Sequence, residues 1–174
     1  MRRFVVIISI LLLSACQAVK VYYDYDKETD FSNYTTYNYY PDIQTGLSQL
    51  DERRLFDAID SELQLKGIRF SEDPDFLIDV KTRFFRPQQT SNVGVGVGGN
   101  GRNMGGGVSI GIPVGQPNEK REIRFDFVDS KKDLLFWDAV SESNFKENTG
   151  PEKREEIIRK VVAKVLSKYP PKAK

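Results

Sequence analysis

The residue with the most distinctive chemistry in this sequence is Cys16, the only cysteine of the chain. It follows an apolar run from Phe4 to Leu13, and the basic residues Arg2 and Arg3 precede that run. A basic start, a short apolar run and small residues before a cleavage point are typical of a secretory signal. The run is too short to cross a bilayer, because a spanning helix needs about 20 apolar residues. We therefore expect residues 1–15 to be a signal peptide.

The segment Leu13-Ser14-Ala15-Cys16 resembles the bacterial lipobox, L-[AS]-[AG]-C, at every position. The resemblance implies cleavage between Ala15 and Cys16, a diacylglycerol on the Cys16 sulfur and an acyl chain on the new amino terminus. One acyl chain binds a membrane weakly, whereas two or more hold a protein there stably. The alternatives are a plain secretory signal with an unrelated cysteine and a buried amino-terminal helix. On the lipobox interpretation, residues 16–174 form a single domain anchored by lipid.

Gln17 bears on which membrane holds the anchor. In enterobacteria-like systems, an Asp directly after the lipidated cysteine resembles an inner-membrane retention signal. Gln17 therefore favours the outer membrane. We expect a protein of the bacterial cell envelope that faces the periplasm.

Charge and histidine content exclude several classes of function. Loss of residues 1–15 removes Arg2 and Arg3 from 26 basic residues and none of the 25 acidic ones, so the net charge changes from +1 to −1. This balance gives no electrostatic basis for nucleic-acid binding. The chain has no histidine, which excludes Ser-His-Asp and Cys-His catalysis and removes the commonest zinc ligand. We expect no enzymatic activity, no metal and no cofactor other than the lipid on Cys16.

Two groups of acidic residues suggest chemistry that their spacing does not support. The first has a spacing of two residues and comprises Asp24, Asp26, Glu28 and Asp30. A calcium loop that starts at Asp24 needs Gly and Glu where Thr29 and Thr35 stand. The second group, a possible catalytic carboxylate pair, comprises Asp126, Asp129, Asp133 and Asp138. These four are scattered over a predicted strand and turn, so a solvated surface is the simpler interpretation.

Hydrophobic periodicity predicts an α+β fold. Alternation with period two predicts strands at 19–25, 34–40, 76–84, 121–128 and 134–145. Apolar residues at helical spacing predict two helices, one over residues 48–66 and one that starts at 149–152 and stops before Pro170. Ser48 is the expected N-cap of the first helix, and Thr149 with Glu152 forms a capping box for the second. We expect a mostly antiparallel sheet of about five to seven strands with both helices on one face.

A glycine-rich insertion at residues 93–115 has an alternating Val-Gly and Ile-Gly pattern around a Gly/Asn centre. The pattern predicts a hairpin with one apolar face and one nearly bare face. Gly94, Gly96 and Gly99 match G-x-G-x-x-G, but no helix-forming segment follows, so nucleotide binding is not expected. A bare glycine face allows a partner backbone to approach closely. Gly94, Gly96 and Gly98 are therefore candidates for a partner surface.

Tyrosines are concentrated near the amino terminus, where seven of the eight lie between Tyr22 and Tyr40. An aromatic surface for a glycan or a peptide is one interpretation, with Tyr22, Tyr37 and Tyr39 as its candidate residues. Packing of alternating strand aromatics against the core is the ordinary alternative.

Three sequence motifs resemble a bacterial lipoprotein family catalogued as a domain of unknown function, family 4136. They are D-Y-D at 24–26, D-F-S-x-Y-x-T-Y at 30–37 and L-L-F-W-D-A at 134–139. The resemblance covers nearly all of the chain after Cys16. In that family a basic residue and Gly usually follow the Trp, where this chain has Asp138 and Ala139.

Together these features predict an envelope lipoprotein with a non-catalytic binding or structural role and a protein or cell-wall partner. The alternative is a periplasmic small-ligand binder that uses the Tyr-rich strands and the Gly-rich hairpin as its pocket.

Overall fold

The computed structural model describes residues 19–87 and 119–171. The signal segment, Cys16 and the predicted hairpin at 93–115 lie outside these residues. The elements in chain order are β1 (Lys20–Tyr25), the 3₁₀ turn η2 (Phe31–Asn33), β2 (Thr36–Tyr39), α2 (Gln49–Leu65), β3 (Arg69–Phe70), β4 (Phe76–Phe85), β5 (Lys120–Asp129), β6 (Leu134–Asn144) and α3 (Pro151–Leu166).

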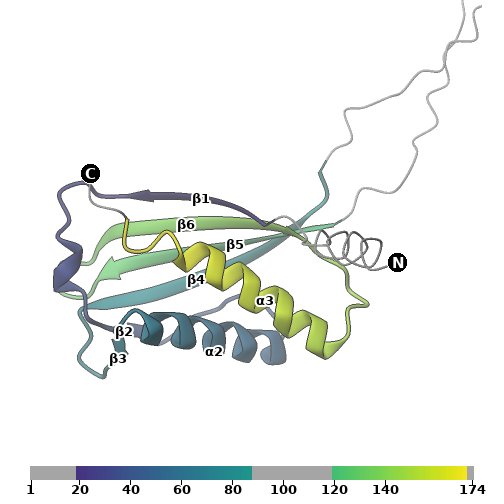
Figure 1. The fold of residues 1–174 in the computed structure, drawn as a ribbon, viewed down its shortest axis with the longest axis horizontal. Coiled ribbons are helices and arrows are strands. Elements are labelled where there is room, and N and C mark those ends of the chain that lie inside the picture. The colour runs from purple at the N-terminus through teal and green to yellow at the C-terminus, as the bar shows by residue number, and fades with distance from the viewer. Residues whose placement is uncertain (1–18, 88–118, 172–174) are drawn as a thin grey trace, which may run out of the picture.

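The strands form one sheet in the order β1-β6-β5-β4-β2-β3, and α2 and α3 lie on one face of it (Figure 1). The predicted α+β class, the strand number and the placement of the helices are confirmed. The sheet is mixed, because β2 is parallel to both β3 and β4. Helix α2 provides the crossover connection that parallel neighbours need. The sequence pattern does not reveal β3, because two residues are too few to show a period.

One end of the sheet brings together strand ends that are distant in sequence. The start of β1 lies opposite the end of β6, with Lys20 paired to Glu142. The end of β4 lies opposite the start of β5, with Phe85 paired to Lys120, and Lys120 pairs in turn with Asn144. The first described residues, Val19 and Lys20, therefore lie at the end of the sheet where β4 stops and β5 begins. We call this the β1-start end.

The two helices begin in different ways. Ser48 caps α2 as expected, since its hydroxyl accepts a hydrogen bond from the Asp51 N–H at 3.4 Å. The capping box expected at Thr149 is wrong. Gly150 is the N-cap of α3 and provides no side-chain acceptor, while the Thr149 hydroxyl donates to the Lys146 carbonyl at 2.7 Å. Pro151 still occupies the first turn, where its missing N–H is not needed.

Aromatic rings fill the core between the sheet and α3. Phe127 is fully buried, with its ring centroid 5.0 Å from Phe76, 4.7 Å from Trp137 and 4.8 Å from Tyr169. Strict alternation in the predicted strand 134–145 would place Phe136 on the face opposite Trp137, but the structure buries both side chains. A register shift between β5 and β6 leaves Phe136 as an extra residue. Such a bulge re-aims the side chain, and Phe136 is buried with the others.

Tyr34 links this core to the end of β5. Its ring stacks on Phe136 at 4.0 Å, and its hydroxyl donates to Asp129 Oδ2 at 2.8 Å. Burial and the nearby Asp129 carboxylate raise the pKa of Tyr34 from 10.0 to about 12. Burial and the carboxylate of Asp60 also raise the pKa values of Tyr37 and Tyr39.

These raised pKa values predict a loss of stability at high pH. Between pH 10 and about 12 the folded protein keeps the Tyr34 proton while the unfolded chain releases it, so the free energy of unfolding falls as the pH rises. Urea unfolding followed by circular dichroism at pH 9 and pH 11 measures this decline. Tyr34→Phe should make it smaller, whereas Tyr22→Phe, at an exposed position, should leave it unchanged. An equal decline in the Tyr34→Phe protein would contradict the assignment to Tyr34.

Candidate functional site on the uncovered sheet face

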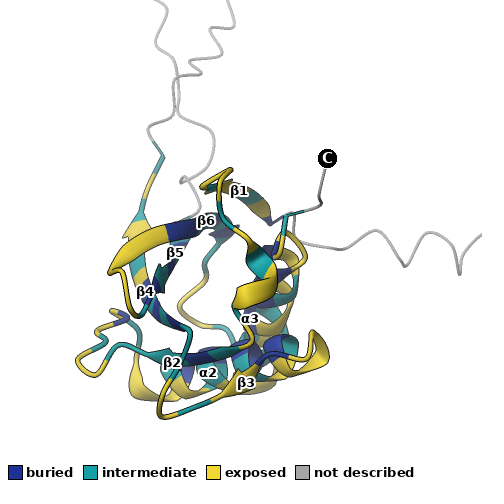
Figure 2. Ribbon diagram, turned by 90° about the vertical axis from the view of Figure 1, so that its left-hand side faces the viewer, coloured by how far each residue is buried: buried dark blue, intermediate teal, exposed yellow. Residues whose placement is uncertain are grey.

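The face of the sheet that the helices do not cover carries the candidate site, which we call the open face. Strands β1, β6, β5 and β4 lie side by side with α3 to one side of them (Figure 2). Along β5, the odd-numbered residues from 121 to 129 are buried and the intervening ones are partly or fully exposed. The open face thus consists of every second residue of each strand.

Four aspartates form a row across the open face. Asp24 on β1 lies opposite Asp138 on β6, Asp138 lies opposite Asp126 on β5, and Asp126 lies opposite Asp79 on β4. Like charges at directly opposed positions repel each other. Burial raises the pKa of Asp138; the charge of Arg124 opposes this rise, and the charges of Asp126 and Asp24 add to it. We call these four residues the Asp row.

Basic side chains from the adjacent row neutralise part of this charge. Arg124 donates to both Asp126 Oδ1 and Asp138 Oδ2 at 2.9 Å, and Lys81 pairs with Asp79 at 2.6 Å. The Asp24 carboxylate accepts only the N–H of its neighbour Tyr25 among the described residues, at 2.9 Å. The Asp row therefore keeps a net negative charge that is concentrated toward the β1 edge.

A shallow hollow of about 230 Å³ lies at that edge. Its lining residues come from the end of β1 and the start of β6, and they are Asp24, Tyr25, Asp26, Leu135, Phe136, Trp137 and Asp138. Three carboxylates and the half-exposed Leu135 suit a partner group that is both cationic and partly apolar. The described residues contain no group of Asp, Glu, Cys or His placed to hold a metal ion.

The predicted tyrosine surface is only partly on the open face. Tyr22 projects there with 59% of its surface exposed. It lies opposite Val140 on β6, which in turn lies opposite Arg124 on β5. Tyr37 is only 2% exposed, and it lies with Tyr39 on the helix-covered face, where both hydroxyls donate to Asp60 Oδ1 at 2.6 Å. Both rings therefore pack against the core, and their hydroxyls are bound to Asp60. Tyr37 and Tyr39 do not form an exposed aromatic surface.

The remaining predicted site residues, Ala15, Cys16, Gly94, Gly96 and Gly98, lie outside the described part of the chain. Sequence reasoning did not find the Asp row. The signal for it in the sequence was an aspartate at an outward position in four of the five predicted strands, but only the strand register brings the four together. Of the carboxylates considered from the sequence, Asp126 and Asp138 do meet, whereas Asp129 is the buried last residue of β5 and Asp133 lies in the turn that follows.

Residues 21–171 match the model of a family described as "Domain of unknown function (DUF4136)". The chain belongs to this family. The resemblance seen in the sequence motifs is therefore confirmed, and the DUF4136 match covers the sheet and both helices. No curated protein matches the chain.

Solved structures share the fold of this DUF4136 domain at low sequence identity. A PDZ domain protein from Parabacteroides distasonis ATCC 8503 matches with a TM-score of 0.55 and 15% identity over 95% of this chain. The match spans only 39% of that protein's length. Two PelC dodecamer structures from Paraburkholderia phytofirmans match with a TM-score of 0.50 at 12% and 11% identity. Each match includes 86% of this chain, and the matches include 95% and 96% of the two PelC chains.

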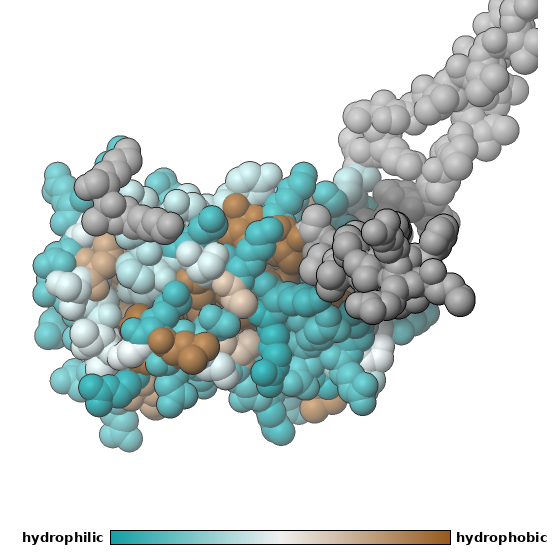
Figure 3. Space-filling model, in the orientation of Figure 1, coloured by the Kyte–Doolittle hydropathy of each residue, from teal (hydrophilic) through white to brown (hydrophobic). Residues whose placement is uncertain are grey.

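The helix-covered side of the DUF4136 domain is mainly hydrophilic, with apolar side chains in small groups (Figure 3). Within residues 19–87 and 119–171, no helix is long and apolar enough to cross a membrane.

Proposed function

We propose that this DUF4136 protein is a bacterial envelope lipoprotein, anchored by lipid on Cys16, with a binding or structural role and no catalytic activity. The observation that carries the proposal is the position of the lipobox directly before the fold. Val19, three residues after Cys16, is already buried, and its carbonyl accepts a hydrogen bond from Lys164 Nζ at 2.6 Å. A lipid on Cys16 would therefore hold the domain close to the membrane surface.

This anchor gives the domain an orientation. The β1-start end of the sheet would face the membrane, because Lys20 begins β1 there. The open face runs away from that end along β1, β6, β5 and β4, so a partner in the periplasm has access to it. Gln17 supports an anchor in the outer membrane, on the periplasmic side.

The charge pattern of the open face supports a macromolecular partner, either a protein or the cell wall, that carries positive groups. The hollow at the β1 edge is open and smaller than the 300–1,000 Å³ that is usual for small-molecule pockets. The hydroxyls of Tyr37 and Tyr39 are already bound to Asp60. These features favour a contact surface over a small-ligand pocket. The absence of histidine supports a role without catalysis.

Replacement of Cys16 tests the anchor. We expect the native protein to incorporate radiolabelled palmitate in its bacterial host and to sediment with the outer membrane. Cys16→Ala should abolish the label and the sedimentation, because no thiol remains to carry the lipid. Ser14→Ala is a matched control that keeps the lipobox pattern and should be labelled normally. A Cys16→Ala protein that stays labelled and bound to the membrane would refute the anchor.

Site-specific photocrosslinking in intact envelopes tests the binding role. A crosslinker at position 140, in the centre of the open face, should capture a defined envelope component. The same crosslinker at position 159, an exposed position of α3, should not. A crosslink to a second copy of the chain would assign the open face to self-assembly, the behaviour that PelC shows as a dodecamer. Equal capture at both positions would argue against a partner surface on the open face.

A further inference from the structure

Arg121 is an arginine buried without an ionic partner. It lies near the start of β5 on the helix-covered face, and only 4% of its surface is exposed. Its Nε has no hydrogen-bond partner, and the described residues provide no acid within ion-pair distance of its guanidinium. Burial lowers the pKa of Arg121. The guanidinium carbon lies 5.7 Å from the centroid of the Phe145 ring, a contact that provides no formal negative charge. A buried charge is costly unless it is paired with an opposite one, so this position calls for an anion.

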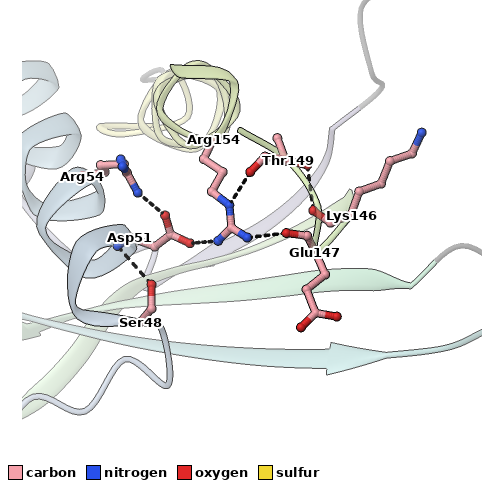
Figure 4. A network of polar contacts seen from close by, with 7 residues as sticks. All are labelled: Ser48, Asp51, Arg54, Lys146, Glu147, Thr149 and Arg154. Atoms are coloured by element: carbon pink, nitrogen blue, oxygen red, sulfur yellow. Dashed lines mark hydrogen bonds and ion pairs between the residues drawn. The ribbon is translucent and has the colours of Figure 1, made fainter. Parts of the chain in front are cut away.

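The acidic side chain that acts on Arg121 is already bound to other residues. Asp51 attracts Arg121 electrostatically, but its two carboxylate oxygens are held by Arg54 Nη1 at 2.6 Å and Arg154 Nη1 at 2.8 Å. Figure 4 shows Asp51 between these two arginines. One carboxylate thus serves three guanidinium groups, and the region keeps a positive excess.

A small cavity opens beside Arg121. Its volume is about 10 Å³, enough for roughly one water-sized group. The lining residues are Arg121, Asn144, Phe145, Lys146, Thr149, Arg154 and Ile157. Three of them are cationic and none is acidic. The first turn of α3 also borders the cavity, and its N-cap Gly150 provides no side-chain acceptor, so the positive end of the helix dipole adds to the potential.

We propose that this cavity binds a phosphate group. One phosphate oxygen enters beside Arg121, and the rest of the group stays at the mouth, near Lys146 and Arg154. Guanidinium groups at a helix N-terminus are a recurrent arrangement for phosphate recognition. Arg121 pairs with Ser143, which places the cavity at the β1-start end of the sheet. The phosphate therefore has two possible sources, free phosphate or the headgroup of a membrane lipid. The proposal does not depend on lipidation of Cys16.

Phosphate titration of the purified full chain in nonionic detergent tests the site. We expect phosphate to raise the Tm relative to chloride at equal ionic strength. Arg121→Met should weaken phosphate binding by about 10-fold or more, the loss expected for a hydrogen bond to a charged group. The exposed Lys146 should contribute less, so Lys146→Gln should weaken binding by a smaller factor. Arg69→Gln, at an exposed position of the edge strand β3, is the matched control and should bind phosphate normally.

The Tm without phosphate separates loss of the site from misfolding. Arg121→Met should melt at or above the native Tm in phosphate-free buffer, because it removes an unpaired buried charge. A native protein whose Tm does not respond to phosphate would overturn the proposal. So would an Arg121→Met protein that keeps the full response.

A second titration distinguishes the two sources. The probe is dihexanoyl phosphatidylglycerol at concentrations where it is monomeric. Binding that is tighter than that of inorganic phosphate and is lost in Arg121→Met assigns the site to a lipid headgroup. Tighter binding of inorganic phosphate, with the same dependence on Arg121, assigns it to free phosphate. If neither ligand depends on Arg121, the proposal fails.

Discussion

Asp51→Asn is expected to lower the free energy of unfolding by about 3–5 kcal/mol, the usual cost of removing one partner from a buried ion pair. Asp51 is 3% exposed and holds Arg54 on its own helix and Arg154 on α3. Asparagine keeps the shape but loses the charge. Arg54 and Arg154, both partly buried, would then lose their shared carboxylate, and the buried Arg121 would lose the negative charge that attracts it.

Urea unfolding at pH 7 followed by circular dichroism measures this effect. Asp57→Asn, in the same helix but exposed, is the matched control and should change stability by less than about 0.5 kcal/mol. Arg121→Met in the Asp51→Asn background should recover part of the loss, because it removes one of the unpaired charges. Equal effects of Asp51→Asn and Asp57→Asn would contradict the prediction. They would mean that water, rather than Asp51, satisfies Arg54 and Arg154.

Phe127→Ala is expected to destabilise the domain by about 3–5 kcal/mol, the range measured for large aromatic residues truncated in a core. The Phe127 ring contacts Phe76 from β4, Trp137 from β6 and Tyr169 after α3. Its removal leaves a cavity between the sheet and the end of the chain. Neighbours that are themselves rigid rings cannot collapse into that space, which places the cost toward the upper part of the range.

Phe70→Ala is the matched control for Phe127→Ala. Phe70 is 59% exposed on the edge strand β3, so its truncation removes little buried area. We expect a loss below about 1 kcal/mol, since substitutions at exposed positions have small effects. Urea midpoints of the two variants give the comparison. A Phe127→Ala protein as stable as Phe70→Ala would mean that the aromatic core rearranges to fill the gap.

The sequence predicts most of the elements because their periodic patterns are long. The β5 segment alternates over all ten residues and β4 over its first half, and Leu55, Ile59 and Leu63 mark the buried stripe of α2. The parts that were not predicted depend on local geometry. The bulge that buries Phe136 breaks the period of two, and the two-residue β3 has no period at all.

The candidate sites were harder to predict, because each is made by contacts between distant segments. The Asp row joins Asp24 to Asp79 only through two intervening strands, and a register shift of one residue would turn each carboxylate to the other face. Tyr37 and Tyr22 are both strand tyrosines in the sequence, yet one lies in the core and the other on the open face. Arg121 has a buried position in the alternation of β5, but its lack of a partner is visible only once Asp51 and Arg154 are placed.

The aromatic core also gives this protein a built-in optical probe. Trp137 is the only tryptophan of the chain, it is fully buried, and the Tyr169 ring lies 5.2 Å away. Its fluorescence emission therefore reports one location, the junction of β5, β6 and the segment after α3, without any added label. Circular dichroism reports mainly on α2 and α3. Coincidence of the two signals during unfolding is thus a direct test of whether sheet core and helices melt as one cooperative unit.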